Sequence, residues 1–369
     1  MAEPIEISQL GKTYPGGNEA LRDMSINVDP GSFLVLLGPS GSGKTTLLRC
    51  LAGIEKVSAG SITIGGRVVA SGTRTHVPPD QRDLSMVFQD YALWPHLSAA
   101  DNVAFALRRR HLPRSECRAR ATAMLDRVGL GALAGRYPNQ LSGGEQQRVA
   151  LARALIADTG LILCDEPLSN LDADLRERMR VERSTLVREA AATTVYITHD
   201  QAEAFALADR VGVLEHGRIV QQGTPEEIYT EPATPFVARF TGLAGELKAR
   251  IKERNTDGTV LVEHDAGIPF LARSGSAAAA PSGTGVTVLI RPTGVHLCSA
   301  SGTGASEPGH LTGRVTDVAF RGRGYEHAID IDGRTRLTGV LAETKVPRGE
   351  PVGVRLDVTG CHAFPADPP

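Results

Sequence analysis

The stretch from Gly38 to Thr46 constrains this chain more than any other. It follows the apolar run Phe33–Leu37 and precedes a helix-forming segment that starts at Leu47. A strand, a glycine-rich turn and a helix N-terminus in this order predict a phosphate-binding loop, because the backbone N–H groups turn inward and the helix dipole adds positive potential. The loop residues expected to bind the phosphates are Gly38, Pro39, Ser40, Gly41, Ser42, Gly43, Lys44, Thr45 and Thr46.

Two side chains of this loop have specific expected roles. Lys44 would reach the β- and γ-phosphates, and the Thr45 hydroxyl group would bind Mg²⁺. The alternative is a glycine-rich turn that carries a lysine by chance. Average composition gives such a match in roughly 1 in 100 chains of this length, and the strand and helix on either side make chance a weaker explanation.

Composition excludes several classes of protein. The chain has 369 residues, which is enough for roughly two to three domains. A net charge of -2 and an aromatic content of 4% argue against a nucleic-acid partner. No apolar run reaches the roughly 18 residues of a membrane helix, and the acidic N-terminus does not resemble a secretory signal. A role at a membrane would therefore need a partner that spans it.

The five cysteines are odd in number and far apart in the sequence. This spacing argues against a disulfide framework or a zinc site, and it fits a reducing cytoplasm.

A second segment is also expected to present a helix N-terminus to an anion. Ser142 is a good N-cap residue, and the glycines after it allow another backbone or a ligand to come close. The residues of this segment are Ser142, Gly143, Gly144, Glu145 and Gln146.

Polar side chains follow two further apolar strands. Asp165 and Glu166 come after Leu161–Cys164, and His199 follows Thr193–Thr198. Ligands of open α/β sheets bind at the carboxyl ends of the strands. Asp165 could hold Mg²⁺ directly or through water, and Glu166 could orient or deprotonate the attacking water. A lone histidine is usually structural, but its place at this edge of the sheet favours a functional role for His199.

Two loops carry aromatic side chains. Tyr14 could stack on a flat ring such as adenine, or it could simply pack on the surface. The segment after Gln89 is either local core or a docking surface for a partner. Its candidate contact residues are Tyr91, Trp94, Pro95 and His96.

The sequence changes character after Gly242, where short alternating runs replace the helical periodicity. About six short strands without helices predict a small all-β barrel. OB-like barrels often bind oligonucleotides, but the scarcity of aromatic residues argues against that here. Residues 274–285 and 299–309 are low-complexity connections.

Together, residues 1–240 resemble the ATP-binding subunit of an ABC transporter. The tail resembles the TOBE region of importer ATPases, through Leu289–Pro292 and Gly313–Val315. Two Ser/Gly/Ala insertions in the tail are longer than such turns need. The matching motifs are the Walker A loop Gly38–Thr45, Gln89 at the Q-loop, the LSGGQ-type signature Leu141–Gln146, the Walker B segment Leu161–Glu166, the D-loop Ser169–Ala173, His199 as the switch histidine and Tyr14 at the A-loop.

The resemblance implies a fold and a domain plan. The fold is α/β, a P-loop NTPase with a RecA-like core and antiparallel β and helical subdomains, followed by an all-β, OB-like TOBE domain. The ATP-binding domain would span residues 1–240, with the helical subdomain at about 90–157, and the TOBE-like barrel would span 241–369.

The resemblance also implies a mechanism that uses ATP and Mg²⁺. Tyr14 would hold adenine, whereas Thr45, Gln89 and Asp165 would surround the metal. The catalytic residues would be Lys44, Glu166 and His199. The signature residues Ser142 to Gln146 would act on the ATP of a second copy of the chain, because one chain offers only one phosphate loop.

The implied partners are that second copy, integral membrane permease subunits and, indirectly, a substrate-binding protein, at the cytoplasmic face of the cell membrane. The substrate expected first is iron(III), with a polyamine, 2-aminoethylphosphonate, sulfate or a sugar as alternatives. A non-transport ABC ATPase would carry coiled-coil or zinc insertions, or two cassettes, and the sequence has none of these. A P-loop kinase or GTPase needs neither a signature helix nor a switch histidine, and a catalytically dead subunit would not need Glu166 and His199.

Overall fold

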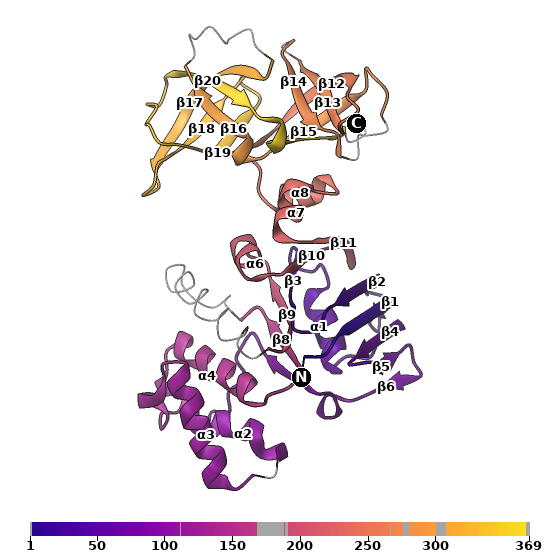
Figure 1. The fold of residues 1–369 in the computed structure, drawn as a ribbon, viewed down its shortest axis with the longest axis vertical. Coiled ribbons are helices and arrows are strands. Elements are labelled where there is room, and N and C mark those ends of the chain that lie inside the picture. The colour runs from indigo at the N-terminus through magenta and orange to yellow at the C-terminus, as the bar shows by residue number, and fades with distance from the viewer. Residues whose placement is uncertain are drawn as a thin grey trace. The chain divides into compact units, whose positions relative to one another are not determined.

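The computed structural model describes residues 2–110, 112–167, 188, 191–265, 267–275, 280–299 and 308–366. Within this part the chain forms two compact units, Met1–Pro225 and Glu226–Pro369 (Figure 1). The sequence analysis predicts the boundary later, after residue 240. In the structure, the segment that contains helix α8 (Pro235–Phe240) belongs to the second unit. The expected D-loop, Ser169–Ala173, lies outside the described residues.

A six-stranded sheet forms the centre of the first unit, as the expected P-loop fold requires. Its strand order is β11-β10-β3-β9-β8-β7, and all neighbours except β10 and β11 are parallel. Every residue of β3, β8 and β9 is buried, which is typical of strands covered on both faces. The strands are β3 (Phe33–Leu37), β7 (Leu84–Val87), β8 (Leu161–Asp165), β9 (Thr193–Thr198), β10 (Arg210–Glu215) and β11 (Arg218–Gly223).

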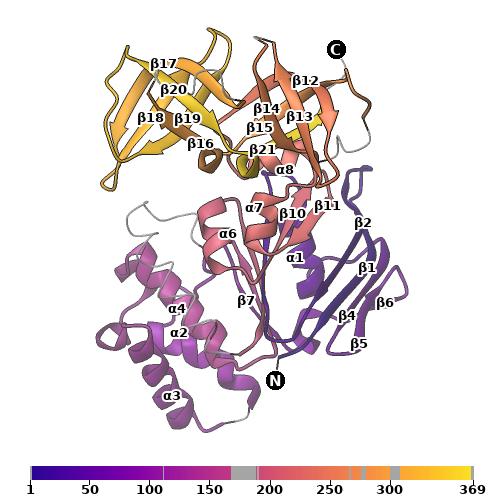
Figure 2. The ribbon, with the colours of Figure 1, turned by 45° about the horizontal axis from the view of Figure 1, so that its top comes forward.

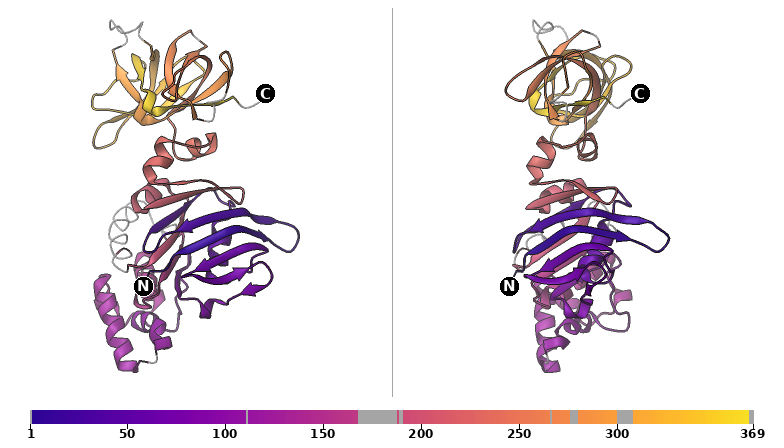
Figure 3. Two further views of the ribbon diagram at one scale, coloured as in Figure 1. Left: turned by 45° about the vertical axis from the view of Figure 1, so that its right-hand side comes forward. Right: turned by 90° about the vertical axis from the view of Figure 1, so that its right-hand side faces the viewer.

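Helices α1 (Lys44–Ala52) and α6 (Gln201–Leu207) follow strands β3 and β9. A second, antiparallel sheet has the order β2-β1-β4-β5-β6, and Figure 3 shows its long first strands in indigo. Its inward-facing residues share one hydrophobic core with α1 and the central sheet. The strands are β1 (Ile5–Thr13), β2 (Glu19–Val28), β4 (Ala59–Ile64), β5 (Arg67–Ser71) and β6 (Thr75–His76).

Three helices form a separate layer of the first unit, seen at the lower left of Figure 2. They are α2 (Ala99–Phe105), α3 (Arg114–Arg127) and α4 (Gly143–Ile156), and their apolar faces meet around Val103, Leu125 and Val149. None of the helices that the structure describes is both long enough and apolar enough to cross a membrane.

The second unit is all-β apart from short helices that include α7 (Pro225–Thr230) and α8. It has a closed five-stranded barrel and a five-stranded sheet, which share one core, so it is larger than the barrel of about six strands expected from the sequence. The barrel strands are β12 (Gly245–Arg254), β13 (Thr259–His264), β14 (Pro269–Arg273), β15 (Gly285–Ile290) and β21 (Cys361–Pro365). The sheet strands are β16 (Val295–Cys298), β17 (His310–Phe320), β18 (Tyr325–Asp330), β19 (Arg336–Ala342) and β20 (Pro351–Leu356).

Candidate nucleotide-binding site

The glycine-rich loop joins β3 to α1, and two of its positions accept only glycine. A Cβ atom on Gly38 would lie 2.5 Å from the carbonyl oxygen of Leu214. Gly43 has a φ of +102°, and a Cβ atom there would lie 2.6 Å from the carbonyl oxygen of Ala20. The loop therefore packs directly against neighbouring backbone, which fixes its shape.

Lys44 lies in the concave side of this loop and is only 5% exposed. Its Nζ atom donates hydrogen bonds to the carbonyl oxygens of Gly38 (2.7 Å) and Pro39 (2.9 Å). Burial lowers the pKa of the Lys44 ammonium group, while Glu166 and Asp165 act in the opposite direction. A partly desolvated cation in a ring of backbone groups suits the phosphates of a nucleotide.

A cavity of about 610 Å³ opens beside the loop. This volume is in the range of small-molecule sites. Tyr14 is half-buried in its wall, with the hydroxyl group 3.4 Å from Thr46 Oγ1 and Lys12 Nζ 4.7 Å from the ring centre. The predicted residues that line the cavity are Tyr14, Ser40, Gly41, Ser42, Gly43, Lys44, Thr45, Thr46, Gln89 and Glu166.

The cavity also has walls that the sequence did not predict. They come from the β1–β2 turn and the start of β2, and from the tight turn between β10 and β11. The added residues are Asn18, Glu19, Ala20, Arg22, His216 and Gly217. The β10–β11 turn is far from the loop in sequence and reaches the site because β10 pairs with β3. The start of β2 belongs to the other sheet, and its backbone packs against Gly43 of the loop.

Asp165 ends β8 and is 5% exposed. The Thr45 hydroxyl group donates a hydrogen bond to its Oδ1 atom at 3.2 Å. Burial raises the pKa of the Asp165 carboxyl group, an effect that the Thr45 hydrogen bond and Arg49 oppose. A buried carboxylate beside a hydroxyl group is a donor set that fits Mg²⁺, because this ion prefers oxygen ligands and would offset the cost of burying the charge.

Glu166 and His199 meet at the carboxyl edge of the sheet. His199 Nδ1 lies 3.0 Å from Glu166 Oε2, and the His199 side chain is 53% exposed. Glu166 has a φ of 41°, in the left-handed region, and its N–H group donates to the carbonyl oxygen of Ile197 at 3.2 Å. Such a conformation costs about 1–3 kcal/mol and often marks functional positions. The strained backbone places the Glu166 carboxylate in the cavity wall, within reach of His199.

Glu203, a buried glutamate that the sequence did not predict, stabilises the segment that carries His199. Glu203 is 4% exposed and accepts hydrogen bonds from the hydroxyl groups of Tyr196 and Thr198. Thr198 Oγ1 also accepts a bond from the backbone N–H group of Asp200 at 3.0 Å. These contacts fix the end of β9 on both sides of His199.

The signature segment forms the N-terminus of α4. The backbone N–H and hydroxyl groups of Ser142 donate to Glu145 Oε2 at 2.7 and 2.8 Å. These two bonds lower the pKa of the Glu145 carboxyl group. The Gln146 amide donates to the carbonyl oxygens of Pro138 and Leu141. Ser142 and Gly143 are exposed and Gly144 is buried, and none of the five signature residues lines the cavity beside Lys44 as the structure describes it.

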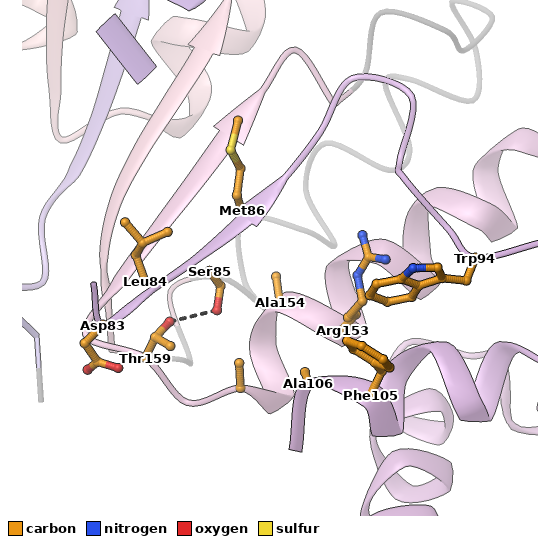
Figure 4. Close-up of a pocket in the computed structure, with 11 residues that line it drawn as sticks. Asp83, Leu84, Ser85, Met86, Trp94, Phe105, Ala106, Arg153, Ala154 and Thr159 are labelled. Carbon is orange, nitrogen blue, oxygen red and sulfur yellow. Dashed lines mark hydrogen bonds between the residues drawn. The ribbon is translucent and has the colours of Figure 1, made fainter. Parts of the chain in front are cut away.

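The loop after Gln89 is held by Arg153. The guanidinium group of Arg153 donates to the carbonyl oxygens of Tyr91 and Ala92, both at 2.7 Å, and lies 5.1 Å from the Trp94 ring centre. Trp94 packs against Phe105, with 4.1 Å between the ring centres (Figure 4). Pro95 and His96 are exposed, whereas Tyr91 is only 5% exposed. Tyr91 is therefore part of the local core rather than the surface.

Trp94, Phe105 and Arg153 form one side of a hollow of about 390 Å³. Its other side is β7, where the Ser85 hydroxyl group is hydrogen-bonded to Thr159 at 2.8 Å (Figure 4). The hollow thus separates the central sheet from the helical layer of the first unit.

Comparisons with known proteins agree with this geometry. Residues 21–169 match the ABC transporter family and residues 288–364 match the TOBE domain. The chain is 42% identical to the Fe(3+) ions import ATP-binding protein FbpC of Agrobacterium fabrum, over 89% of this chain and 88% of that protein. It is 40% identical to the sn-glycerol-3-phosphate import ATP-binding protein UgpC 3 of the same organism, over 98% of each.

A solved structure extends the likeness to the fold. The ATP-binding cassette MJ0796, in a dimeric post-hydrolysis state bound to ADP and Pi, is 31% identical with a TM-score of 0.54, and the match covers 60% of this chain and 98% of that one. The chain therefore belongs to the ATP-binding subunits of ABC importers that carry a C-terminal TOBE domain, and it is an ATPase.

Proposed function

We propose that this chain hydrolyses ATP between two copies of itself and so drives the uptake of a small solute through a separate membrane permease. The observation that carries this proposal is the division of the site. The cavity beside Lys44 contains the phosphate loop and Glu166, whereas the exposed N-terminus of α4 at Ser142 lies outside it. A second copy, related by two-fold symmetry, can supply its own Ser142, Gly143 and Gly144 to close the cavity.

The predicted side chains of the cavity have separate roles in this cycle. Tyr14 stacks on adenine, while Lys44 and the loop N–H groups hold the phosphates. Thr45, Gln89 and Asp165 would hold Mg²⁺, which neutralises phosphate charge when bound.

Glu166 and His199 position the water that attacks the γ-phosphate. The Glu166 carboxylate accepts a hydrogen bond from the water and orients it towards the γ-phosphate. His199, 3.0 Å from that carboxylate, keeps Glu166 in place and can donate to the phosphate. Catalysis then rests on positioning and on charge stabilisation.

The permease contact is proposed to lie at the hollow of Figure 4. Trp94 lines this hollow, and the exposed Pro95 and His96 follow it in the chain. Arg153 links the hollow to the loop that starts at Gln89 in the nucleotide cavity. A helix of the permease seated there would sense whether nucleotide is bound. The buried Tyr91 would act by holding this loop in shape.

We infer that the transported substrate is iron(III), because a relative that is 42% identical is named for Fe(3+) import. Another relative is named for sn-glycerol-3-phosphate import, and polyamine, 2-aminoethylphosphonate, sulfate and sugar import are further alternatives. In each case a substrate-binding protein would deliver the solute, and this chain would work at the cytoplasmic face of the membrane through its permease.

The Glu166→Gln variant tests the proposal. It should bind ATP, form a stable dimer in light scattering, and lose at least about 100-fold in the rate of hydrolysis, since general-base groups contribute about 10²–10⁴-fold. The matched control is Glu6→Gln, an exposed position on β1, which should behave like the unchanged protein. A Glu166→Gln variant that hydrolyses ATP at the normal rate, or that stays monomeric with ATP, would refute the assignment.

A further inference from the structure

A groove in the second unit lies outside all the motifs described above. Its volume is about 720 Å³, and it runs along the outward faces of β12 and β15. The turn between β18 and β19 forms the opposite wall. The barrel and the five-stranded sheet share one hydrophobic core, so the two walls are fixed relative to each other. This volume is that of a small-molecule site.

The groove contains three acidic side chains, of which Glu246 and Asp332 are held by contacts within the protein, whereas Asp265 makes no ion pair among the described residues. The Arg239 guanidinium group donates two hydrogen bonds to the Glu246 carboxylate, at 2.7 and 3.1 Å. The Asp332 carboxylate accepts bonds from the backbone N–H groups of Arg334 (2.9 Å) and Thr335 (2.6 Å). Asp332 also lies 3.7 Å from His264 Nε2, a contact that ties the β18–β19 turn to the barrel.

The remaining cations have no such partner. Within the described residues, no ion pair involves Lys248, Arg250 or Arg334, although all three line the groove. Lys248 and Arg250 are two residues apart on β12, so they point from the same face of the strand. The groove carries four cationic side chains, which are these three and Arg239, against three acidic ones, Glu246, Asp265 and Asp332, so its net charge is positive and favours an anion.

The floor of the groove leaves room for a ligand next to these cations. Gly285 pairs with Arg250 across the β12–β15 ladder, and a Cβ atom on Gly285 would meet nothing within 4 Å. Thr287, which pairs with Lys248, adds a hydroxyl group to the same wall. The space beside Arg250 is therefore open, and polar groups surround it.

We propose that this groove binds a small soluble polyanion, a metabolite with two or more phosphate or sulfate charges, through Lys248, Arg250 and Arg334. Arginine side chains hold such groups through two parallel hydrogen bonds, and lysine adds a point charge. The site is separate from the nucleotide cavity, because all its residues belong to the second unit. Bound polyanion would stabilise that unit by mass action.

Inorganic pyrophosphate is the probe for this site. Calorimetric titration of the full chain at low ionic strength, with saturating ADP in the phosphate loop, should give binding that weakens as salt is added. The double variant Lys248→Glu/Arg334→Glu should bind pyrophosphate at least about tenfold more weakly, since each lost charge-assisted bond removes about that much. The matched control, Arg323→Glu/Lys345→Glu, has the same change in charge at exposed positions outside the groove, and it should retain binding.

A steric variant separates the groove from general surface charge. Gly285→Phe leaves every charge in place but fills the open space, and it should also abolish pyrophosphate binding while circular dichroism shows a folded chain. The proposal fails if the unchanged protein does not bind pyrophosphate at millimolar concentration, if the control variant weakens binding equally, or if Gly285→Phe binds normally. Charge-dependent binding to phosphatidylglycerol vesicles without pyrophosphate binding would assign the groove to lipid and overturn it too.

Discussion

Substitution of Arg82 tests how contacts at the C-terminus of α1 stabilise the phosphate loop at its N-terminus. This side chain is 2% exposed. Its guanidinium group donates to the carbonyl oxygens of Cys50 (2.8 Å) and Leu51 (2.5 Å), at the C-terminus of α1, and to that of Val77 (2.9 Å). Helix α1 begins at Lys44, so one buried side chain anchors the helix that carries this lysine of the phosphate loop.

Arg82→Leu should destabilise the first unit by about 3–5 kcal/mol. The carbonyl oxygens of Leu51 and Val77 would lose the partner that the structure gives them, and each buried, unsatisfied group costs about 1–3 kcal/mol. The cavity left by the guanidinium group adds to this loss. Arg82→Lys keeps the charge but reaches fewer oxygens, and an intermediate loss is expected.

The assay is urea unfolding followed by tryptophan fluorescence. The chain has one tryptophan, Trp94, which belongs to the first unit, so the signal reports the unfolding of that unit alone. Arg67→Leu is the control, because the exposed Arg67 makes a single 3.3 Å bond to the carbonyl oxygen of Gln81, and a change within about 0.5 kcal/mol is expected. An Arg82→Leu midpoint equal to that of the unchanged protein would refute the reasoning.

Three further predictions concern single side chains. Trp94→Ala should abolish ATPase stimulation by the permease but not the basal rate, whereas the control Phe320→Ala, at a 64% exposed aromatic, should change neither. Tyr14→Ala should raise the KM for ATP about tenfold with kcat unchanged, and Tyr14→Phe should restore it, because stacking contributes about 1 kcal/mol. Burial, Arg291 and Arg273 lower the pKa of His362 to about 4. The unfolded chain therefore binds more protons below about pH 6.5, and the second unit should lose about 3 kcal/mol between pH 7 and pH 4. Circular dichroism should show this loss in the unchanged chain but not in His362→Leu.

The chemistry of the site could be predicted where it is carried by consecutive residues. The phosphate loop, the Asp165-Glu166 pair and His199 each lie at the end of an apolar strand, and a parallel sheet brings such ends to one edge. The structure places Lys44, Thr45 and Glu166 in one cavity, with Asp165 and His199 bonded to two of them.

The features that were missed depend on contacts between distant parts of the chain. His216 reaches the cavity only because β10 pairs with β3. Glu203 is an acidic residue on a short helix, and nothing in its sequence pattern reveals that two hydroxyl groups from β9 satisfy it. The burial of Tyr91 has the same origin, since Arg153 lies 62 residues away.

The domain boundary illustrates the same limit. Arg291 at the end of the barrel donates to the carbonyl oxygens of Ala238 (2.8 Å) and Gly242 (2.6 Å). These bonds hold α8 to the barrel, so α8 belongs to the second unit. The fading of helical periodicity after residue 240 marks a change of secondary structure rather than the edge of a compact unit.

The bonds between Lys44 and its own loop have a consequence for nucleotide turnover. Since the ammonium group is already held by the carbonyl oxygens of Gly38 and Pro39, the loop does not need to fold around its ligand. An incoming phosphate can take over the ammonium group, because a hydrogen bond to an anion is stronger than a bond to a neutral carbonyl oxygen. We therefore expect spent nucleotide to be replaced without a slow reordering step, so that the pace of each transport cycle depends on the parting of the two copies.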